Sequence, residues 1–475
     1  MSENYFVGKV LSGDLKKDVD ILNRELAVDI NFDIVSRDVV VGGKNARFYF
    51  IDGFCKDEVM QKMLEFLMEK QADDMPTDAV ALLKHAIPYV EVEQEKSIEK
   101  IQASLLSGMF LLVIDGFTDA VLLDARTYPA RSVSEPEKDK VLRGSKDGFV
   151  ETIVFNTALI RRRIRDTDLR MEMLSIGKTS KTDVVVCYMD SRVDKKLLNN
   201  IKYMLETIQV DALNLNQESL AECLVPGKWL NPFPKFKYTE RPDAAAAQVL
   251  EGNIILLVDN SPSAMILPTT IFKVLEEADD FYFPPLTGTY LKITRFLIAV
   301  LTYILTPTFL LFMNNTEWIP ERFEFVMLKE PPNVSLIWQF LILELAIDGL
   351  KLAAVNSPSM LSTPLSVMAA LVLGEFSVNS GWFSSEVMLY MAFVAIANYT
   401  QSNYELGYAL KFMRIISLLL TQFLNLWGYI AGITLTLLLI AFNKTVCRRS
   451  YLYPLIPFDG KALKRVLVRN RIEKI

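Results

Sequence analysis

The sequence predicts an α/β region of two similar subdomains followed by an α-helical transmembrane bundle. Hydrophobic residues make up 51% of the 475-residue chain and charged residues 23%, a mixture that predicts two classes of segment. The long uncharged stretches all follow Pro285, whereas the residues before it resemble an ordinary charged globular protein. A third observation is the apolar stretch at residues 335–355, which has membrane-spanning length and yet carries three charged residues. We therefore expect a soluble part followed by a membrane part.

The soluble part contains an approximate internal repeat. Residues 46–54 and 184–190 each predict a strand that ends in an aspartate turn and leads into an amphipathic helix. The hairpin expected at residues 108–127, with Asp115 and Gly116 in its turn, recurs at residues 251–270. Two patterns repeated in the same order predict a duplicated α/β subdomain. A charged helix is also expected at residues 91–106.

We expect five segments along the chain. They are an N-terminal helical lead (residues 1–30), cytosolic subdomain 1 (31–135), cytosolic subdomain 2 (136–285), the transmembrane domain (286–443) and a basic cytosolic tail (444–475). The tail has nine Lys and Arg residues against two acidic ones, which suits the cytoplasmic face of a membrane. The first 20 residues contain no apolar signal-peptide stretch, so we expect the soluble part to stay in the cytoplasm.

Composition and motifs argue against several classes of function. The net charge is −6 and the acidic excess lies in the first 290 residues, which argues against a nucleic acid partner. Four widely spaced cysteines and a single histidine argue against a disulfide framework, a zinc site and histidine-based catalysis. Phosphate-binding, nucleophile-elbow, metalloprotease and kinase motifs are absent from the sequence. We expect neither an enzyme nor a cofactor.

The membrane part predicts about six spans. The first is residues 296–313, followed by an acidic loop suited to the outer face, and the second is residues 335–355. A third, at residues 361–374, is interrupted by proline and glycine, and a fourth covers residues 387–404. Residues 415–443 are uncharged, long for one span and short for two, and Trp427-Gly428 permits a tight hairpin or a kink. We expect six spans, with five plus a re-entrant segment as the alternative.

The candidate functional residues lie on the charged span. Glu344, Asp348 and Lys351 are spaced to share one helix face, where intramembrane charges commonly face an ion path or a partner helix. Glu375, beside the interrupted third segment, is expected to contribute. The alternative is structural: Asp348 and Lys351 neutralise each other inside the bundle, or the stripe locks helices together. We also expect the basic run Arg161–Arg165 to be a solvated face, or else a contact with another subunit or with lipid.

Several motifs resemble the A-subunit family of bacterial spore germinant receptors, the GerA type. They lie at residues 144–151, 156–163, 177–182 and 238–243, and the sequences FSSEVMLY, NYELGYALKFMR and YLYPLIPF resemble most the stage V sporulation protein AF branch. Two departures are Ser145 and Lys351, where the family usually has proline and arginine. The motif residues carried over from the family are Gly148, Glu151, Asn156, Arg161, Arg163, Arg241 and Pro242.

The resemblance implies a function in spore germination. It implies a multi-pass protein of the inner spore membrane, with a cytosolic α/β region and a cytosolic tail. It also implies a homo-oligomer that contacts membrane lipid, with transporter-like B-type and lipoprotein C-type subunits as partners. An ion channel, and specifically a cation channel, is the expected activity. The alternative is a non-conducting scaffold or signalling subunit that docks partners through its cytosolic domain.

Overall fold

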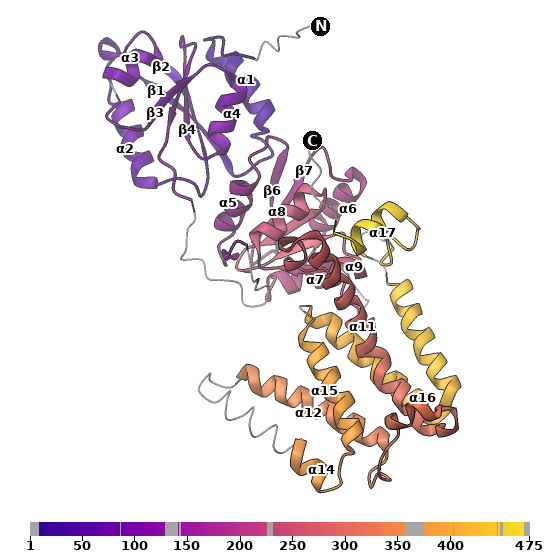
Figure 1. The fold of residues 1–475 in the computed structure, drawn as a ribbon. Coiled ribbons are helices and arrows are strands. Elements are labelled where there is room, and N and C mark those ends of the chain that lie inside the picture. Colours follow the sequence, from indigo (N-terminus) through magenta and orange to yellow (C-terminus); the bar gives the residue numbers. More distant parts are fainter. Residues whose placement is uncertain are drawn as a thin grey trace. The chain divides into compact units, whose positions relative to one another are not determined.

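The computed structural model describes residues 9–85, 87–128, 141, 144–225, 231–356, 374–401, 403–443, 445–446 and 450–469. The chain forms two compact units (Figure 1). We call Met1–Pro226 with Phe236–Pro268 the α/β unit, and Gly227–Lys235 with Thr269–Ile475 the helical unit.

The α/β unit contains two five-stranded antiparallel sheets with the same strand order. The first runs β1 (Ile34–Val41), β2 (Lys44–Ile51), β4 (Phe110–Ile114), β5 (Ala120–Leu123) and β3 (Val92–Glu95). The second runs β6 (Leu169–Ile176), β7 (Thr182–Met189), β9 (Ile254–Val258), β10 (Ala264–Leu267) and β8 (Lys237–Thr239). The predicted hairpins are β4–β5 and β9–β10, which occupy equivalent places. The shared strand order confirms the repeat inferred from the sequence.

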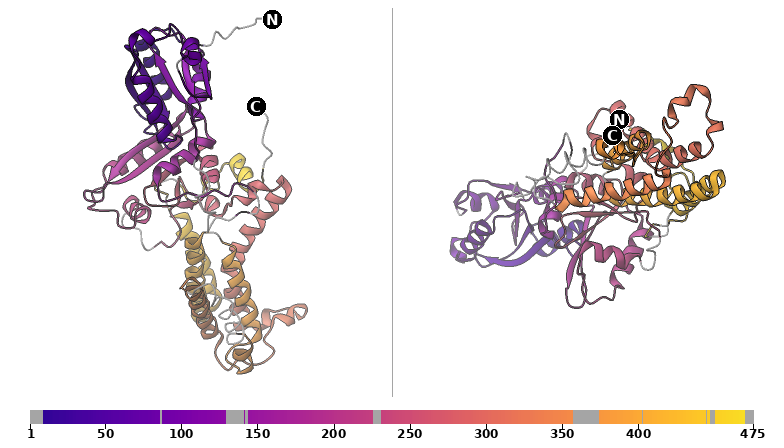
Figure 2. Two further views of the ribbon diagram at one scale, coloured as in Figure 1. Left: turned by 90° about the vertical axis from the view of Figure 1, so that its left-hand side faces the viewer. Right: turned by 90° about the horizontal axis from the view of Figure 1, so that it is seen from below.

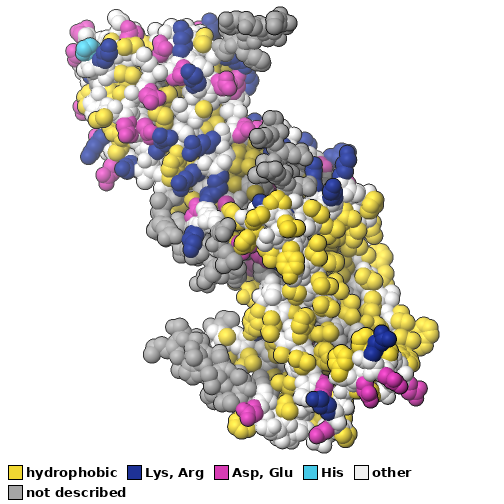
Figure 3. Space-filling view, in the orientation of Figure 1, with side chains coloured by type: hydrophobic (Ala, Val, Ile, Leu, Met, Phe, Trp, Pro, Cys, Tyr) yellow, Lys and Arg dark blue, Asp and Glu magenta, His cyan; other side chains and the backbone are white. Residues whose placement is uncertain are grey.

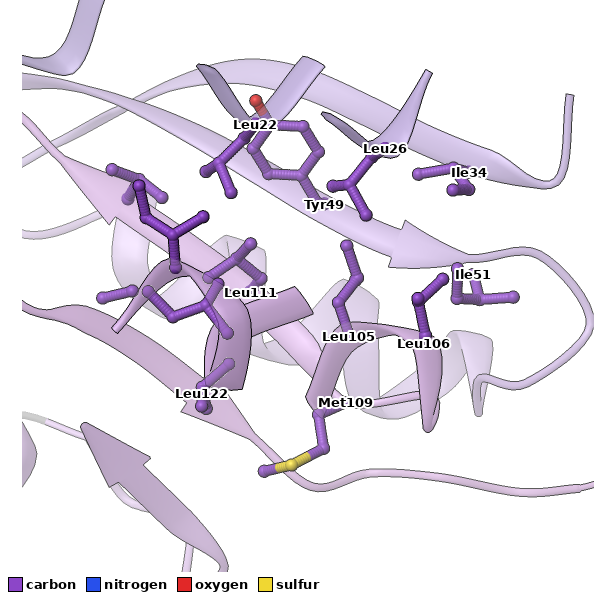
Figure 4. Packing of buried hydrophobic residues seen from close by; sticks show 14 of the residues in the cluster. Leu22, Leu26, Ile34, Tyr49, Ile51, Leu105, Leu106, Met109, Leu111 and Leu122 are labelled. Carbon is purple, nitrogen blue, oxygen red and sulfur yellow. The ribbon is translucent and has the colours of Figure 1, made fainter. Parts of the chain in front are cut away.

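Helices cover these sheets. The first sheet is accompanied by α1 (Leu15–Leu26), α2 (Asp57–Met68), η1 (Ala72–Asp74), α3 (Ala79–His85) and α4 (Ile98–Leu106). The second is accompanied by α5 (Ile153–Arg163), α6 (Lys195–Glu206), α7 (Gln217–Leu224) and α8 (Pro242–Leu250). Figure 4 shows one core, in which Leu22 and Leu26 of α1 and Leu105 of α4 pack against Tyr49 of β2. Each of these four side chains is fully buried, which removes apolar surface from water.

The helix expected at residues 91–106 begins later than predicted. Residues 92–95 form the edge strand β3, which pairs with β5, and helix α4 begins only at Ile98. The glutamates that suggested a helix instead lie on the edge of a sheet, where charged side chains discourage pairing with another chain.

In the helical unit, the helices α11, α15 and α16 lie beside one another (Figure 2), and the other elements are shorter or cross them. The elements of this unit are α9 (Ile271–Leu275), α10 (Asp279–Tyr282), α11 (Pro285–Asn314), η2 (Thr316–Trp318), η3 (Glu321–Val326), α12 (Leu336–Asn356), α14 (Ser377–Asn379), α15 (Ser385–Tyr399), α16 (Tyr404–Ala441) and α17 (Gly460–Leu467). Among described residues, α11 and α16 are long and apolar enough to cross a membrane. Helix α15 is shorter, and the third expected span lies almost wholly outside the described residues.

Helix α16 reverses direction at Asn425. This residue has φ +50° and ψ −128°, a conformation outside the helical region. A Cβ atom added to Gly428 would lie 1.8 Å from the carbonyl oxygen of Leu420, and one added to Gly432 would lie 2.5 Å from Oγ of Ser417. The two halves of α16 therefore pack against each other in opposite directions. Of the two arrangements that the sequence left open for residues 415–443, the structure has the tight hairpin.

Apolar side chains cover much of the flank of the helical unit. Figure 3 shows them gathered on this face, with charged side chains at its lower end. The strongly exposed apolar side chains of the helical unit include Leu389, Ile396, Phe423, Trp427 and Leu437, each more than 60% exposed. Such a continuous apolar surface is typical of a segment that contacts lipid or another subunit.

Candidate functional site

The charged stripe of α12 faces two basic residues of α16. Arg414 Nε donates to Glu344 Oε1 at 2.6 Å, and Arg414 Nη1 donates to the carbonyl oxygen of Thr302 at 2.8 Å. Lys411 Nζ pairs with the carboxylate of Asp348 and lies 3.8 Å from Glu344 Oε2. We call Glu344, Asp348, Lys411 and Arg414 the charged network. It ties α12 to the first half of α16, and Thr302 extends it to α11.

Burial makes this network energetically important. Glu344 is 3% exposed and Arg414 is fully buried, while Lys411 is 6% exposed. An unpaired charge in such a place is strongly destabilising, so each partner is needed to keep the other in the bundle. The network contains two carboxylates and two cations, which cancel. The stripe can therefore remain inside an apolar helical unit.

Lys351 takes a different environment from the one expected. Its Nζ atom lies 5.5 Å from the ring centre of Tyr399 and 5.7 Å from that of Tyr408. These aromatic faces attract a cation. The structure thus pairs Asp348 with Lys411, which lies far away in the sequence on α16, rather than with Lys351, one turn away on the same helix.

Sequence reasoning missed Lys411 and Arg414. The uncharged stretch was expected to begin at residue 415, which placed both cations between the predicted spans, after the fourth span at residues 387–404. The available signal was the spacing of three residues, which puts them on one face of a helix. A further signal was the need of two buried carboxylates for cationic partners.

Glu375 lies apart from the charged network. It is an exposed residue in a single π-helical turn before α14, and it forms no ion pair within the part of the chain that the structure describes. The structure therefore does not bring it together with Glu344 and Asp348. Its expected contribution to an ion path remains a prediction.

A second group of candidates holds the loop before α5 in place. The side chain of Asn156 accepts from the amide of Val150 at 2.8 Å and donates to its carbonyl at 2.6 Å. Arg163 pairs with Asp147 at 2.6 Å, and Arg241 donates to the carbonyl oxygen of Ser145 at 3.0 Å. These three residues thus fasten one loop to α5 and to the start of α8.

The other motif residues have backbone roles in the same region. Gly148 is buried within the loop, and the carbonyl oxygen of Glu151 accepts from the amide of Asn260 at 2.8 Å. Pro242 is the first residue of α8, where a proline costs no helical hydrogen bond. The arrangement supports the fold of the second sheet, and it has the character of a structural cluster.

Arg161 corrects the expectation of a solvated basic face. It is fully buried and forms a two-pronged pair with Asp33, with Nε–Oδ2 at 2.7 Å and Nη2–Oδ1 at 3.0 Å. Asp33 precedes β1 of the first sheet, so this ion pair joins the two halves of the α/β unit. Nearby, the amide of Met171 donates to Asn31 Oδ1 at 2.8 Å. The neighbouring Arg162 packs over the ring of Tyr128 at 4.8 Å.

The comparison with known protein families decides the relationship of this chain. Residues 20–475 match the family described as Bacillus/Clostridium GerA spore germination protein. The chain belongs to this GerA family. Its motif residues and its charged network are therefore features of a GerA protein, from a family that acts in spore germination.

Relatives match over nearly the whole length of this GerA protein. Stage V sporulation protein AF of Bacillus subtilis (strain 168) is 34% identical, with 96% of this chain and 92% of the relative covered. Spore germination protein KA of the same organism is 26% identical over 97% and 85%. Spore germination protein GerLA of Bacillus cereus is 25% identical over 92% and 89%.

A solved structure is also similar to part of this chain. It is the N-terminal domain of the A subunit of the Bacillus megaterium spore germinant receptor GerK3, which is 26% identical. The match covers 55% of this chain and 97% of that domain, with a TM-score of 0.42.

Proposed function

We propose that this GerA protein is a subunit of an oligomeric membrane complex of the endospore inner membrane, and that it conducts cations during germination. The observation that carries the proposal is the charged network inside an apolar helical unit. Intramembrane carboxylates are costly and are typical of ion paths. Family membership supports the germination role, and the exposed apolar flank supports a place in the membrane.

The network suggests how conduction would be gated. Asp348 is at the less buried end, since its side chain is 24% exposed while that of Glu344 is 3% exposed. Its Oδ1 atom is buried and has no hydrogen-bond partner within the described residues. In the resting protomer, Lys411 neutralises this carboxylate. Movement of α16 relative to α12 would separate the pair and present a negative charge to a passing cation.

The proposed assembly is a closed ring of copies of this chain. Partners of the transporter-like B type and the lipoprotein C type are part of the proposal. The α/β unit and the basic tail are assigned to the cytoplasmic side because basic residues are retained there. A ring places the same surface of each protomer around one axis, and a pore requires such closure.

Cation flux through reconstituted protein tests conduction. Glu344→Gln with Asp348→Asn is expected to reduce the permeability to cations relative to anions, because the path loses both negative charges. The matched control is Glu321→Gln with Glu324→Gln, two exposed carboxylates of η3. Equal flux and equal selectivity in all three proteins would rule out the pore assignment.

A non-conducting scaffold is the second candidate. The observation that favours it is that both ion pairs of the charged network form within one protomer. If the chain is a scaffold in which Glu344 and Arg414 only lock helices together, exchanging them (Glu344→Arg with Arg414→Glu) restores the pair and the melting temperature, and neither the wild-type nor the exchanged protein conducts ions. Under the channel proposal, the exchanged protein melts normally and its ion selectivity differs. Cross-linking adds an independent test, since a channel requires a closed ring and a scaffold does not.

A further inference from the structure

The C-terminal segment of the helical unit combines a basic helix with exposed apolar side chains. Helix α17 begins after Asp459, whose side chain accepts from the amides of Lys461 and Ala462, both at 3.0 Å. On a helical projection the basic residues Lys461, Lys464 and Arg465 fall on one side, and Ala462, Leu463, Val466 and Leu467 fall on the other. All three basic residues are exposed.

The loop before α17 supplies the apolar part of this surface. Leu455 is 42% exposed, Ile456 57% and Phe458 74%. Exposed large apolar side chains beside a row of cations are typical of proteins that lie in the interface of a membrane. We call Leu455, Ile456, Phe458, Lys461, Lys464 and Arg465 the tail surface.

Contacts with α9 and α11 set the depth of the tail surface. At one end, the amide of Ile271 donates to the carbonyl oxygen of the buried Tyr451 at 3.0 Å. At the other end, the amide of Arg469 donates to Thr289 Oγ1 at 3.1 Å. Thr289 lies seven residues before the uncharged stretch of α11 that begins at Phe296, or about 10 Å at a rise of about 1.5 Å per residue. The headgroup layer extends roughly 5–8 Å beyond the hydrocarbon core, so α17 is tethered close to it.

We propose that the tail surface binds the headgroups of anionic phospholipids. The basic residues contact the lipid phosphates, while Leu455, Ile456 and Phe458 insert at the boundary of the acyl chains. Charge complementarity favours lipid, because Asp459 is the sole carboxylate of residues 450–469 and its oxygens are occupied as the helix cap and by the hydroxyl of Tyr453. The proposal rests on α11 spanning the membrane and is independent of conduction.

Hydrogen exchange of the full chain in lipid nanodiscs tests this proposal. The probe is phosphatidylglycerol, compared at 0 and 30% in phosphatidylcholine. The amides of residues 460–468 are expected to exchange more slowly with phosphatidylglycerol, and each neutralised basic residue is expected to weaken this dependence about fivefold. Lys461→Gln with Lys464→Gln and Arg465→Gln should therefore abolish it, and 0.5 M salt should reduce it.

Two further variants make the outcome decisive. Arg322→Gln with Lys329→Gln removes two exposed cations from the loop after α11 and should leave the lipid dependence intact. Phe458→Ser keeps every charge and should accelerate hydrogen exchange of residues 460–468 in both lipid mixtures. This variant tests the insertion of the apolar side chains, and it remains informative if the triple variant unfolds α17. Equal exchange of the wild-type segment with and without phosphatidylglycerol would overturn the proposal. The proposal would also be overturned if hydrogen exchange of this segment slowed only when an acidic protein was added. Ion flux is not the readout, so a failure here is distinct from a failure of the proposed channel.

Discussion

The role of a charged residue in this chain is set by the residue opposite it. Glu344 faces Arg414, Asp348 faces Lys411 and Asp33 faces Arg161, and each pair joins two segments that are far apart in the sequence. Burial strengthens the demand for a partner, because water can no longer solvate the charge. The same residue types on an exposed helix would contribute little to stability. We therefore expect the buried pairs to dominate the response to mutation.

Replacement of Arg161 by alanine tests this at one position. The variant leaves Asp33 buried and unpaired, and we expect a loss of about 3–5 kcal/mol in the free energy of unfolding of the α/β unit. The fully buried Cys187 supplies the measurement, since burial raises the pKa of its thiol to about 12 and so suppresses its reactivity in the folded state. The rate of Cys187 labelling should rise accordingly.

The control for this prediction is Arg163→Ala. Arg163 pairs with Asp147, and both side chains are about 20% exposed, so water can partly replace the lost partner. We expect a clearly smaller effect than for Arg161. Equal labelling rates in the two variants would contradict the assignment of the Asp33–Arg161 pair as a buried tie between the two sheets.

At the scale of helices, the packing of the helical unit depends on hydrogen bonds and small residues around the point where α16 reverses direction. Asn425 changes the direction of the chain, and its side chain exchanges hydrogen bonds with that of Asn315 at 2.6 and 2.8 Å. Beyond the turn, the hydroxyl of Tyr303 in α11 bonds to Ser417 of the first half and to Thr436 of the second, at 2.7 and 2.9 Å. Small interface residues and hydrogen bonds between helices are common means of packing in membranes.

Gly428→Ala should disrupt this hairpin. The added methyl group would meet the carbonyl oxygen of Leu420 at 1.8 Å, and the backbone there cannot move without separating the two halves. We expect a loss of about 1–3 kcal/mol, measured as a lower melting temperature of the full chain in detergent. Gly407→Ala lies in the same helix with no atom within 4 Å and should melt like the wild type. A normal melting temperature for Gly428→Ala would show that the halves do not pack this way.

At the scale of the whole molecule, the two units differ in how much of their apolar surface is exposed. The α/β unit has its hydrophobic clusters buried between two sheets and the helices that cover them, whereas the helical unit exposes much of its apolar surface. The first is typical of a domain that folds in water, and the second of one that needs lipid or detergent.

A fragment of residues 9–268, which keeps only residues 227–235 of the helical unit, is expected to fold by itself. It retains both sheets and their cores, so it should be soluble and unfold cooperatively when followed by circular dichroism. A fragment of residues 9–225 is the control, because it lacks β8, β9 and β10 and so loses three of the five strands of the second sheet. Aggregation of the longer fragment, or equal behaviour of the two, would argue against an independent α/β unit.

Local patterns were sufficient for much of the fold. Alternating strands, aspartate turns and amphipathic helices predicted the repeated subdomain, because each pattern depends on residues close in the sequence. The edge strand β3 was missed for the same reason, since its charged residues are compatible with a helix until the pairing with β5 is known. The different contacts of Arg161, Arg162 and Arg163 also escaped prediction, because Asp33, Tyr128 and Asp147 lie outside the helix that carries the arginines.

The sequence by itself determined the division into an α/β part and an apolar part, the family, and the presence of a charged stripe on α12. Hydrophobic periodicity and motif spacing are properties of the chain and need no tertiary contact. Only the tertiary structure decided what the stripe faces, because Lys411 and Arg414 are more than 60 residues away and meet Glu344 and Asp348 through the packing of α12 against α16. It also decided that residues 415–443 turn back at Asn425, since uncharged residues alone do not specify a direction.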